Sequence, residues 1–283
     1  MDTSQLKHGI TALIVIRNEE SLIERCLSSL SNVVDEIILI HDGECEDNSL
    51  EIAKKYNCKI TVAPFIGMPE FHMMNGVYQT TYEWILRIDA DEYLSEELQN
   101  CIRELITSDT YSGYSVEWPI WDGEKYLTKN WPTKPILFRM RDMYFLEEPQ
   151  SNFELKAGEL KVLDDIRLEH RPQYNNYSWK TILTKQKRWA IIHADSTKRK
   201  FEEKRVYNFD YPNTFWYNVR NPRFFLRHTL RRVLPEILLL EGATFFVLPV
   251  LRGHIFKGKG YRYYYKVQIA YKVMLYLRMR KLI

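Results

Sequence analysis

Short apolar runs in the first hundred residues alternate with segments in which apolar residues recur at helical spacing. The runs have the length and character of buried parallel strands and occupy residues 10–16, 36–40, 59–63 and 84–88. Helical spacing follows each run, over residues 22–30, 48–56, 73–81 and 95–106. This βαβαβ order predicts an α/β fold with a mainly parallel central sheet flanked by helices.

Polar residues in front of three of these helices are candidate N-caps. Asn18 precedes the first helix, Asp47 or Asn48 the second, and Ser95 the fourth. Short side-chain oxygens at this position accept hydrogen bonds from the first free N–H groups of a helix. We therefore expect these residues to fix where the helices begin.

The pattern changes from Gly113 onward. Strands are predicted over 113–118 and 135–140, with a turn at Asp122-Gly123, and a basic helix over 177–195. A second basic helix is predicted after Asn221-Pro222, and a last helix over 261–281. The apolar stretch 233–251 contains acidic residues, a glycine and two prolines, which favours an interfacial or packed hairpin over a membrane span.

Composition narrows the class of protein. The chain has 283 residues, of which 45% are hydrophobic and 27% charged, so a wholly disordered chain is excluded. Four cysteines lack the spacing of a metal site and are too few for a disulfide scaffold. The first ten residues lack the pattern of a secretory signal. We therefore expect reduced thiols and a cytoplasmic protein.

Charge is distributed unevenly. Residues 1–113 carry 8 Lys and Arg against 20 Asp and Glu, a net −12, and residues 114–283 carry 32 against 17, a net +15. No acidic residue follows Glu241. A basic, aromatic tail suggests an anionic partner such as a membrane surface on the cytoplasmic side, a lipid-linked substrate or nucleic acid. The alternative is a solvated basic helix, and no nucleic-acid-binding motif is visible.

Acidic and polar residues follow three of the predicted strands, where ligands bind in such sheets. The segments are Arg17-Asn18-Glu19, His41-Asp42-Gly43 and Asp89-Ala90-Asp91-Glu92. Two carboxylates separated by one residue after a strand suit Mg²⁺ or Mn²⁺, which in turn binds a diphosphate. The cation neutralises the charge that grows on a diphosphate leaving group.

In this order, the three segments resemble the family 2 glycosyltransferases, and most closely their lipopolysaccharide-core β-glucosyltransferase branch. The resemblance is clear over residues 10–106 and extends more weakly to about 195. It implies a GT-A type fold with a nucleotide-sugar-binding half at 1–112 and an acceptor-binding and catalytic half at 113–195. A basic, aromatic helical extension that contacts a membrane follows at 196–283.

The resemblance also implies a donor site and a metal site. In the family, the segment after the first strand and the acidic position after the second bind the nucleoside, so either His41 or Asp42 meets the base here. The implied donor-binding residues are Arg17, Asn18, Glu19, His41, Asp42, Asn75, Asp89 and Ala90. Asp91 and Asp89 hold the cation, with His170 as a third ligand or phosphate contact; the alternative for His170 is a structural histidine.

One family feature is missing. The family places Arg before the residue that matches Asn75, and this chain has Met74 there. His72 or Arg139 is a candidate replacement for the diphosphate contact, and the alternative for His72 is a surface histidine.

The acceptor half implies a general base and a sugar platform. Glu154 occupies the place of the carboxylate that takes the acceptor's proton in an inverting transfer, with Glu147 and Glu148 as rivals. Trp118, Trp121 and Trp131 are candidates for a sugar-stacking platform, or for core packing.

The expected function is metal-dependent, inverting transfer of a sugar from a nucleotide donor, UDP above all, to a glycan or lipid-linked glycan acceptor. One alternative is an inactive protein that binds a nucleotide sugar or a membrane on the same scaffold. A sugar nucleotidyltransferase is the other. Its first loop is usually rich in glycine, whereas the segment Arg17-Asn18-Glu19-Glu20 contains none.

Overall fold

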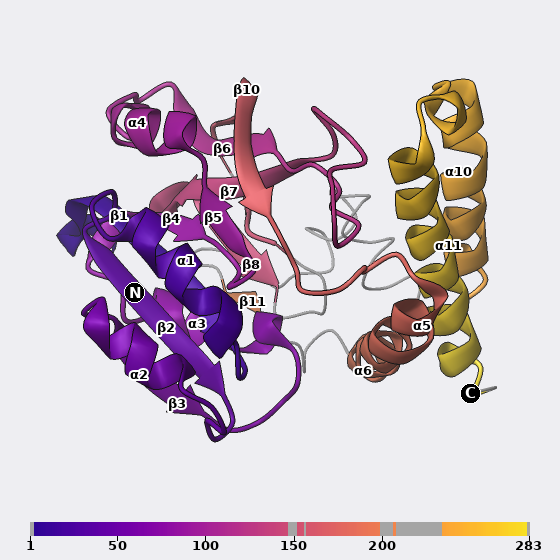
Figure 1. Ribbon diagram of the computed structural model, residues 1–283, viewed down its shortest axis with the longest axis horizontal. Helices are drawn as coiled ribbons and strands as arrows, with labels where there is room; N and C mark the ends of the chain where they lie inside the picture. Colours follow the sequence, from indigo (N-terminus) through magenta and orange to yellow (C-terminus); the bar gives the residue numbers. More distant parts are fainter. Residues whose placement is uncertain (1–2, 147–151, 156, 199–205, 208–233, 282–283) are drawn as a thin grey trace. The chain divides into compact units, whose positions relative to one another are not determined.

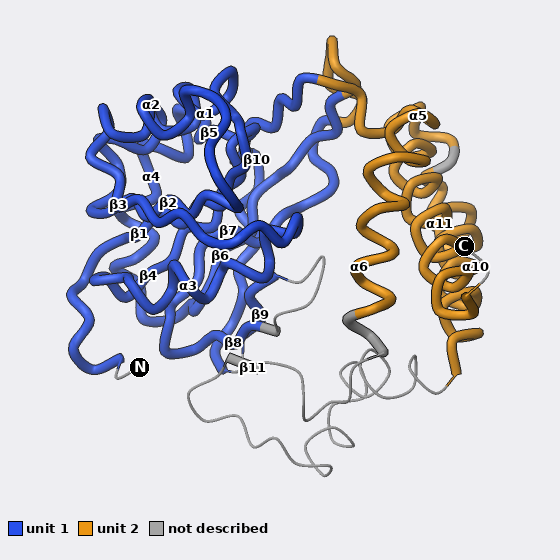
Figure 2. The backbone as a smooth tube through the Cα atoms, turned by 90° about the horizontal axis from the view of Figure 1, so that it is seen from below, with its two compact units in different colours: residues 1–121, 129–173, 207–209 blue, residues 122–128, 174–206, 210–283 orange. Residues whose placement is uncertain are grey.

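The structure is a computed structural model that describes residues 3–146, 152–155, 157–198, 206–207 and 234–281. The chain divides into two compact units. Unit 1 comprises residues 1–121, 129–173 and 207–209, and unit 2 comprises residues 122–128, 174–206 and 210–283 (Figure 2).

Unit 1 is built on an eight-stranded sheet in the order β3-β2-β1-β4-β7-β6-β10-β5 (Figure 1). Its first four strands in the chain are β1 (Lys7–Ile16), β2 (Glu36–Asp42), β3 (Lys59–Ala63) and β4 (Tyr82–Arg87), and they are mutually parallel. The other four are β5 (Glu92–Leu94), β6 (Tyr111–Glu117), β7 (Thr133–Arg139) and β10 (Glu159–His170). The mixed sheet, with four parallel strands at one side, confirms the predicted α/β fold class.

Antiparallel pairing joins the two halves of the sheet. Strand β7 lies antiparallel between β4 and β6, and β10 is parallel to β6 but antiparallel to β5. The strand that follows the Asp89–Glu92 segment therefore pairs with a strand that lies more than sixty residues later. This pairing brings the end of β10 to the acidic loop.

Helices cover both faces of the sheet. The helices of unit 1 are α1 (Glu20–Leu30), α2 (Ser49–Lys55), α3 (Met73–Val77) and α4 (Glu96–Leu105). Ile10, Ala12 and Ile14 of β1 belong to one buried cluster, whereas Leu13 and Val15 belong to another. Both faces of β1 are therefore buried, which explains why its sequence is a continuous apolar run.

One of the three predicted caps differs from the structure. Ser95 is confirmed, because its Oγ accepts a hydrogen bond from Leu98 N at 3.3 Å. The prediction for Asn18 is wrong: it has a left-handed φ of 52°. Helix α1 begins at Glu20, and Glu19 holds its cap position. Before α2, the Asp47 carboxylate accepts from Ser49 N at 2.9 Å, although Asn48 holds the cap position.

Short elements complete unit 1. A three-stranded sheet in the order β11-β8-β9 comprises β8 (Met143–Leu146), β9 (Glu154–Leu155) and β11 (Val206–Tyr207). Three short 3₁₀ turns occupy Thr3–Gln5, Pro69–Phe71 and Met140–Asp142. The sequence pattern did not predict β10, because half of its residues are exposed and its residues do not alternate cleanly between polar and apolar.

The described part of unit 2 is mainly helical. It comprises α5 (Trp179–Thr181), a π-helical turn (Ile182–Gln186), α6 (Lys187–Lys198), α10 (Ile237–Leu251), a 3₁₀ turn (His254–Phe256) and α11 (Lys259–Met279). The predicted helices over 177–195 and 261–281 are therefore confirmed. Within the described ranges, no helix combines the length and apolar character needed to cross a membrane.

Helices α10 and α11 run side by side and antiparallel (Figures 1 and 2). Residues 237–251 of the apolar stretch thus form one helix that packs on α11, so the hairpin consists of α10 and α11 together. An interfacial position of this stretch stays a prediction. The turn predicted at Asp122-Gly123 is also present, since the Asp122 carboxylate accepts from Glu124 N and Lys125 N. The basic helix predicted after Asn221-Pro222 lies outside the described residues. The functional division at 112 and 195 stays a prediction.

Candidate active site

The acidic loop between β4 and β5 is closed by its own hydrogen bonds. Asp89 N donates to the Glu92 carboxylate at 2.9 Å, and Glu92 N donates to Asp89 O at 3.0 Å. Ile88 N donates to Leu13 O at 3.3 Å, which ties the loop to β1. Asp89 and Asp91 therefore lie at the carboxyl end of the parallel strands, as the sequence predicted.

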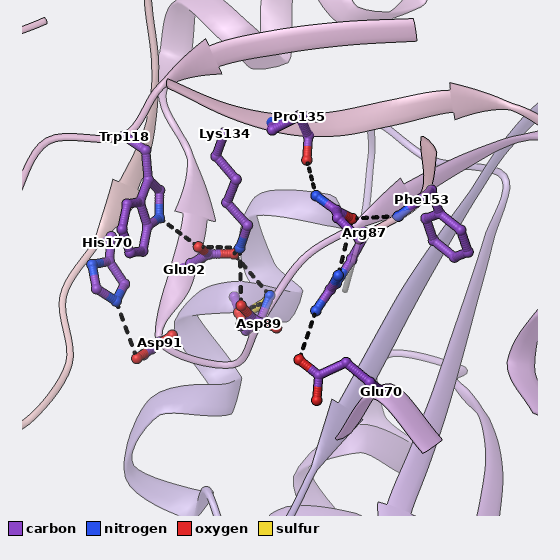
Figure 3. Close-up of polar contacts among 12 residues, drawn as sticks. Glu70, Arg87, Asp89, Asp91, Glu92, Trp118, Lys134, Pro135, Phe153 and His170 are labelled. Atoms are coloured by element: carbon purple, nitrogen blue, oxygen red, sulfur yellow. Dashed lines mark hydrogen bonds and ion pairs between the residues drawn. The ribbon is translucent and has the colours of Figure 1, made fainter. Parts of the chain in front are cut away.

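Lys134 of β7 lies between two carboxylates of this loop (Figure 3). Its Nζ is 2.9 Å from Asp89 Oδ2 and 2.5 and 2.7 Å from the two Glu92 oxygens. Trp118 Nε1 donates to Glu92 Oε1 at 2.6 Å. Glu92 is fully buried, and a buried carboxylate requires a cation and hydrogen-bond donors, which Lys134 and Trp118 supply.

The charges in this cluster shift its pKa values in opposite directions. Loss of hydration raises the pKa of Asp89, but the nearby Lys134 and Arg87 charges lower it more, so the net shift is downward. Burial raises the pKa of Glu92, and the charges of Asp89 and Asp91 add to that rise against the opposing effect of Lys134. Burial lowers the pKa of Lys134, but the two carboxylates raise it above its ordinary value. Lys134 is therefore a permanent cation.

His170, at the end of β10, lies beside Asp91. Its Nε2 is 3.4 Å from Asp91 Oδ2, and Arg171 N donates to Asp91 O at 2.8 Å. The imidazole is buried and stacks on the Trp118 ring with 4.3 Å between centroids. Its Nδ1 is buried without a hydrogen-bond partner among the described residues. The structure thus brings together two of the three predicted metal ligands.

These residues offer a partial metal site. Among the described residues, no group of three His, Cys, Asp or Glu side chains is arranged to hold a metal ion. Asp91 and His170 nevertheless fit as a pair, since neighbouring ligands about 2.1 Å from an octahedral ion lie about 3 Å apart. The Asp91 carboxylate is one quarter exposed and can take a cation that keeps water and phosphate ligands. Asp89 faces Lys134, so its metal contact stays a prediction.

His41 and Asp42, the two candidates for recognition of the nucleotide base, are both buried at the end of β2. Each of them fixes a loop through hydrogen bonds. The Asp42 carboxylate accepts from Ile66 N at 2.7 Å and Gly67 N at 2.8 Å, and it contacts His72 Nε2 at 2.9 Å. His41 Nδ1–H donates to Gly43 O at 2.7 Å, and its Nε2 accepts from Asn18 N at 3.3 Å. A base contact by either residue stays a prediction.

Arg17 and Asn18 reach the same edge from the end of β1. Arg17 Nη1 donates to Asp42 O at 3.0 Å, and its guanidinium lies 4.0 Å above the exposed Phe65 ring. Asn18 exchanges hydrogen bonds with Glu46 at 3.0 and 3.3 Å. The structure therefore groups the predicted donor-binding residues after β1 and β2, and Glu19 N is held by Ser49 Oγ at 2.7 Å.

The candidate replacements for the missing family arginine are both buried. His72 is 1% exposed and bonds to Asp42, so its interpretation as a surface histidine is wrong. Asn75 Nδ2 lies 3.5 Å from His72 Nδ1. Arg139 is 4% exposed, stacks over Trp84 and donates to Ser108 O at 2.8 Å. These contacts give Arg139 a structural role.

The segment that carries Glu154 is tied to the strand that precedes the acidic loop. Arg87 Nη1 donates to Asn152 Oδ1 at 2.9 Å, and Asn152 Nδ2 donates to Pro135 O at 3.0 Å (Figure 3). Glu154 itself lies on β9 and accepts a hydrogen bond from the Tyr144 hydroxyl. Its rivals Glu147 and Glu148 lie outside the described residues.

Two of the three tryptophans predicted to form a sugar-stacking platform, Trp118 and Trp121, contact other side chains of unit 1. Trp118 stacks on His170 and donates to Glu92, so it supports the acidic loop. The Trp121 ring lies 4.4 Å below the Arg171 guanidinium. The sequence pattern missed Lys134, Arg87 and Asn152, because each acts through a partner distant in the chain. The one available signal in the sequence was Glu92, the acidic residue directly after Asp89-Ala90-Asp91, because a buried carboxylate requires a cation beside it.

Comparisons of the sequence with known proteins identify a family. The family model described as "Glycosyl transferase family 2" matches residues 11–162. An uncharacterised glycosyltransferase of Rickettsia typhi is 35% identical over 114 residues, which is 38% of this chain and 37% of that protein. A relative with the same description from Rickettsia bellii is 36% identical over 118 residues, or 40% and 38% of the two chains. The matches thus span less than half of these curated relatives.

Solved structures with detectable likeness are more distant. Staphylococcus aureus TarS 1–349 aligns over 96% of this chain and 91% of its own, with 15% identity and a TM-score of 0.43. Mycobacterium tuberculosis glucosyl-3-phosphoglycerate synthase, solved with Mn²⁺, UDP and glucosyl-3-phosphoglycerate, aligns over 39% and 44%, with 18% identity and a TM-score of 0.34. The matching family model covers more than half of the 283 residues, including the strand ends and the acidic loop. The chain therefore belongs to glycosyl transferase family 2.

Proposed function

We propose that this protein transfers a sugar from a nucleotide donor to a hydroxyl group of a glycan or lipid-linked glycan. The observation that carries the proposal is the pair of Asp91 and His170 beside the Lys134-neutralised carboxylates, at the ligand-binding edge of a family 2 sheet. Because Lys134 already compensates charge in Asp89 and Glu92, Asp91 is the carboxylate left to meet a cation. A bound Mn²⁺ or Mg²⁺ supplies charge neutralisation on the departing diphosphate.

The chain's own residues have distinct proposed roles. The residues after β1 and β2, Arg17 and Asn18 among them, bind the nucleoside. Glu154 takes the proton of the acceptor hydroxyl, and the product linkage is inverted. The Arg87–Asn152 hydrogen bond supports this assignment, because it fixes the segment before Glu154 to the strand that leads into Asp89. UDP as donor nucleotide and an acceptor of the lipopolysaccharide-core type rest on the resemblance in the sequence.

The test measures release of free nucleotide from a panel of nucleotide sugars with Mn²⁺, with Mg²⁺ and with EDTA. We expect metal-dependent release from one donor, because glycosyltransferases of this type hydrolyse their donor slowly when no acceptor is bound. The Asp91→Asn variant keeps the size of the side chain but loses its charge, so release should fall at least about a hundredfold. Asp109→Asn, a change at an exposed aspartate, is the matched control.

Other outcomes would contradict particular parts of the proposal. Donor binding by the parent chain without release, with or without a set of glycan acceptors, would support the inactive donor-binding alternative. Equal activity in EDTA would show that the reaction does not require a metal ion. Full activity of Glu154→Gln with an acceptor would exclude Glu154 as the base.

A further inference from the structure

Helix α10 presents its apolar side chains to solvent. Its buried residues, Ile237, Leu238, Gly242 and Pro249, face the rest of unit 2, and the carboxylate of Glu241 lies 2.7 Å from Lys272 of α11. The charged residue of the helix is therefore turned inward. This is the reverse of the pattern of a surface helix in a soluble protein, whose polar face is the solvated one.

The exposed side of α10 forms a continuous apolar patch. Seven large apolar side chains are exposed by 37–76%: Leu239, Leu240, Phe246, Val247, Leu248, Val250 and Leu251. Together they present on the order of 700 Å² of apolar surface, more than the few hundred Å² usual for the largest such patch on a soluble monomer. We call this set the α10 apolar face.

Basic residues border the α10 apolar face at its C-terminal end. Arg252, Lys257 and Lys259 are exposed in the turn between α10 and α11, next to Phe256, which is 81% exposed. Residues 242–283 contain nine Lys and Arg and no Asp or Glu. An apolar surface with a cluster of cations at one end is complementary to a surface that is apolar inside and anionic at its boundary.

We propose that the α10 apolar face inserts into the interfacial region of an anionic lipid bilayer, with the basic turn on the headgroups. Helix α10 has 15 residues and is about 22 Å long, too short to cross a hydrocarbon core of about 30 Å. A helix of this kind lies in the plane of the interface. A second copy of the chain is the competing occupant, and a parallel pairing of two α10 helices is disfavoured because it brings two basic turns together.

This inference deepens the proposed function, since it places the enzyme at the surface where a lipid-linked acceptor would lie. It does not depend on the chemical step. Membrane binding can therefore fail while donor turnover persists, and the reverse, so the two failures are distinguishable.

The test is flotation of the full-length chain with phosphatidylcholine vesicles, with and without phosphatidylglycerol. We expect the parent chain to float with both kinds of vesicle. In the vesicles that contain phosphatidylglycerol, binding should be about fivefold stronger for each basic residue that reaches the anionic lipid. High salt should remove the phosphatidylglycerol increment and leave the apolar contribution. Leu240→Glu and Val250→Glu should each weaken partitioning about tenfold.

Matched controls are available in the same chain. Leu183 is 60% exposed against 67% for Leu240, and Val162 is 45% exposed against 48% for Val250. Leu183→Glu and Val162→Glu make the same chemical change at the same exposure but outside α10, and should leave flotation unchanged. Circular dichroism melting checks that all four variants fold, and donor hydrolysis should be the same in each.

Three results would overturn the proposal. The first is failure of the parent chain to float with phosphatidylglycerol vesicles. The second is a loss of binding in the control variants as large as the loss in the α10 variants. The third is a dimer in solution, detected by light scattering, that Leu240→Glu dissociates, while the parent chain does not bind vesicles. That result would assign the α10 apolar face to a second copy of the chain.

Discussion

Replacing Lys134 by Met removes the only cation that an atomic contact places between Asp89 and Glu92 among the described residues. The methionine side chain fills a similar volume, so the change removes charge and hydrogen bonds more than packing. Glu92 is then a fully buried carboxylate whose remaining side-chain donor is Trp118 Nε1. We expect the folded state to lose stability because this charge is no longer compensated.

The size of the effect follows from burial. Breaking a buried ion pair by removing one partner costs about 3–5 kcal/mol. The Lys134 side chain is 15% exposed and that of Asp89 39% exposed, so water screens part of the interaction and the low end, about 3 kcal/mol, applies. In a unit of this size, that loss lowers the melting temperature by about 6–12 °C.

The loss should depend on pH in a defined direction. Without Lys134, the pKa values of Asp89 and Glu92 in the folded variant rise above those of the unfolded chain. A carboxylate with a raised pKa makes the folded state bind protons more readily, so the variant regains stability as the pH falls. In the parent, the lowered pKa of Asp89 keeps its contribution intact until the pH falls below the ordinary range of an aspartate. The difference between parent and variant should therefore shrink between pH 8 and pH 5.

The assay is urea unfolding, followed by tryptophan fluorescence, at several pH values. Lys54→Met is the matched control, because Lys54 pairs with Glu51 at 2.5 Å but both side chains are mostly exposed. Such a surface pair contributes about 0–1 kcal/mol. If Lys134→Met cost no more than Lys54→Met, or if its cost were the same at pH 5 and pH 8, the charge-balance account of the loop would be refuted.

Two further predictions concern buried carboxylates elsewhere in unit 1. Asp42→Asn places an amide where backbone N–H groups and His72 now donate, so we expect a loss of about 1–3 kcal/mol and faster protease cleavage at residues 64–68, mapped by mass spectrometry. For Glu36, burial raises the pKa, but hydrogen bonds from Lys59 and Thr81 lower it more. Its stabilising contribution is therefore present above the ordinary pKa of a glutamate and lost as the pH falls through the lower folded value. Glu36→Gln should cost about 1–3 kcal/mol at pH 7, and a gap to the parent that persists unchanged below pH 4 in thermal melts would contradict this account.

Local patterns in the sequence predicted what depends on near neighbours. The apolar runs of β1, β2 and β4 predicted their strands because both faces of these strands are buried. Ser95 predicted the start of α4 because its cap bond spans three residues. The cap assigned to Asn18 failed for a physical reason. Its side chain bonds to Glu46, 28 residues away, and holds Asn18 in a left-handed conformation outside the helix.

The site could be predicted only in part for the same reason. The strand ends placed Asp89, Asp91 and the residues after β1 and β2 at one edge, because parallel strands share the direction in which they end. Lys134 was missed, because it lies 45 residues after Asp89 in the sequence and reaches it from β7, which pairs with β4. The pairing of β10 with β5, which brings His170 to Asp91, was equally invisible to local patterns. The resemblance to the family suggested His170 as a metal ligand or phosphate contact, and that role stays a prediction.

The late closure of the sheet has a consequence for the order in which the protein matures on the ribosome. When a nascent chain has exposed its first 112 residues, β1 to β4 have been synthesised, but Glu92 still lacks Trp118 and Lys134, and β5 lacks its partner strand β10. The loop that carries Asp91 is completed only when residue 171 emerges and its N–H reaches the Asp91 carbonyl. Vectorial synthesis therefore completes the acidic loop well after the strands that carry it, and a chain that ends at residue 112 lacks the Trp118, Lys134 and Arg171 contacts of the site.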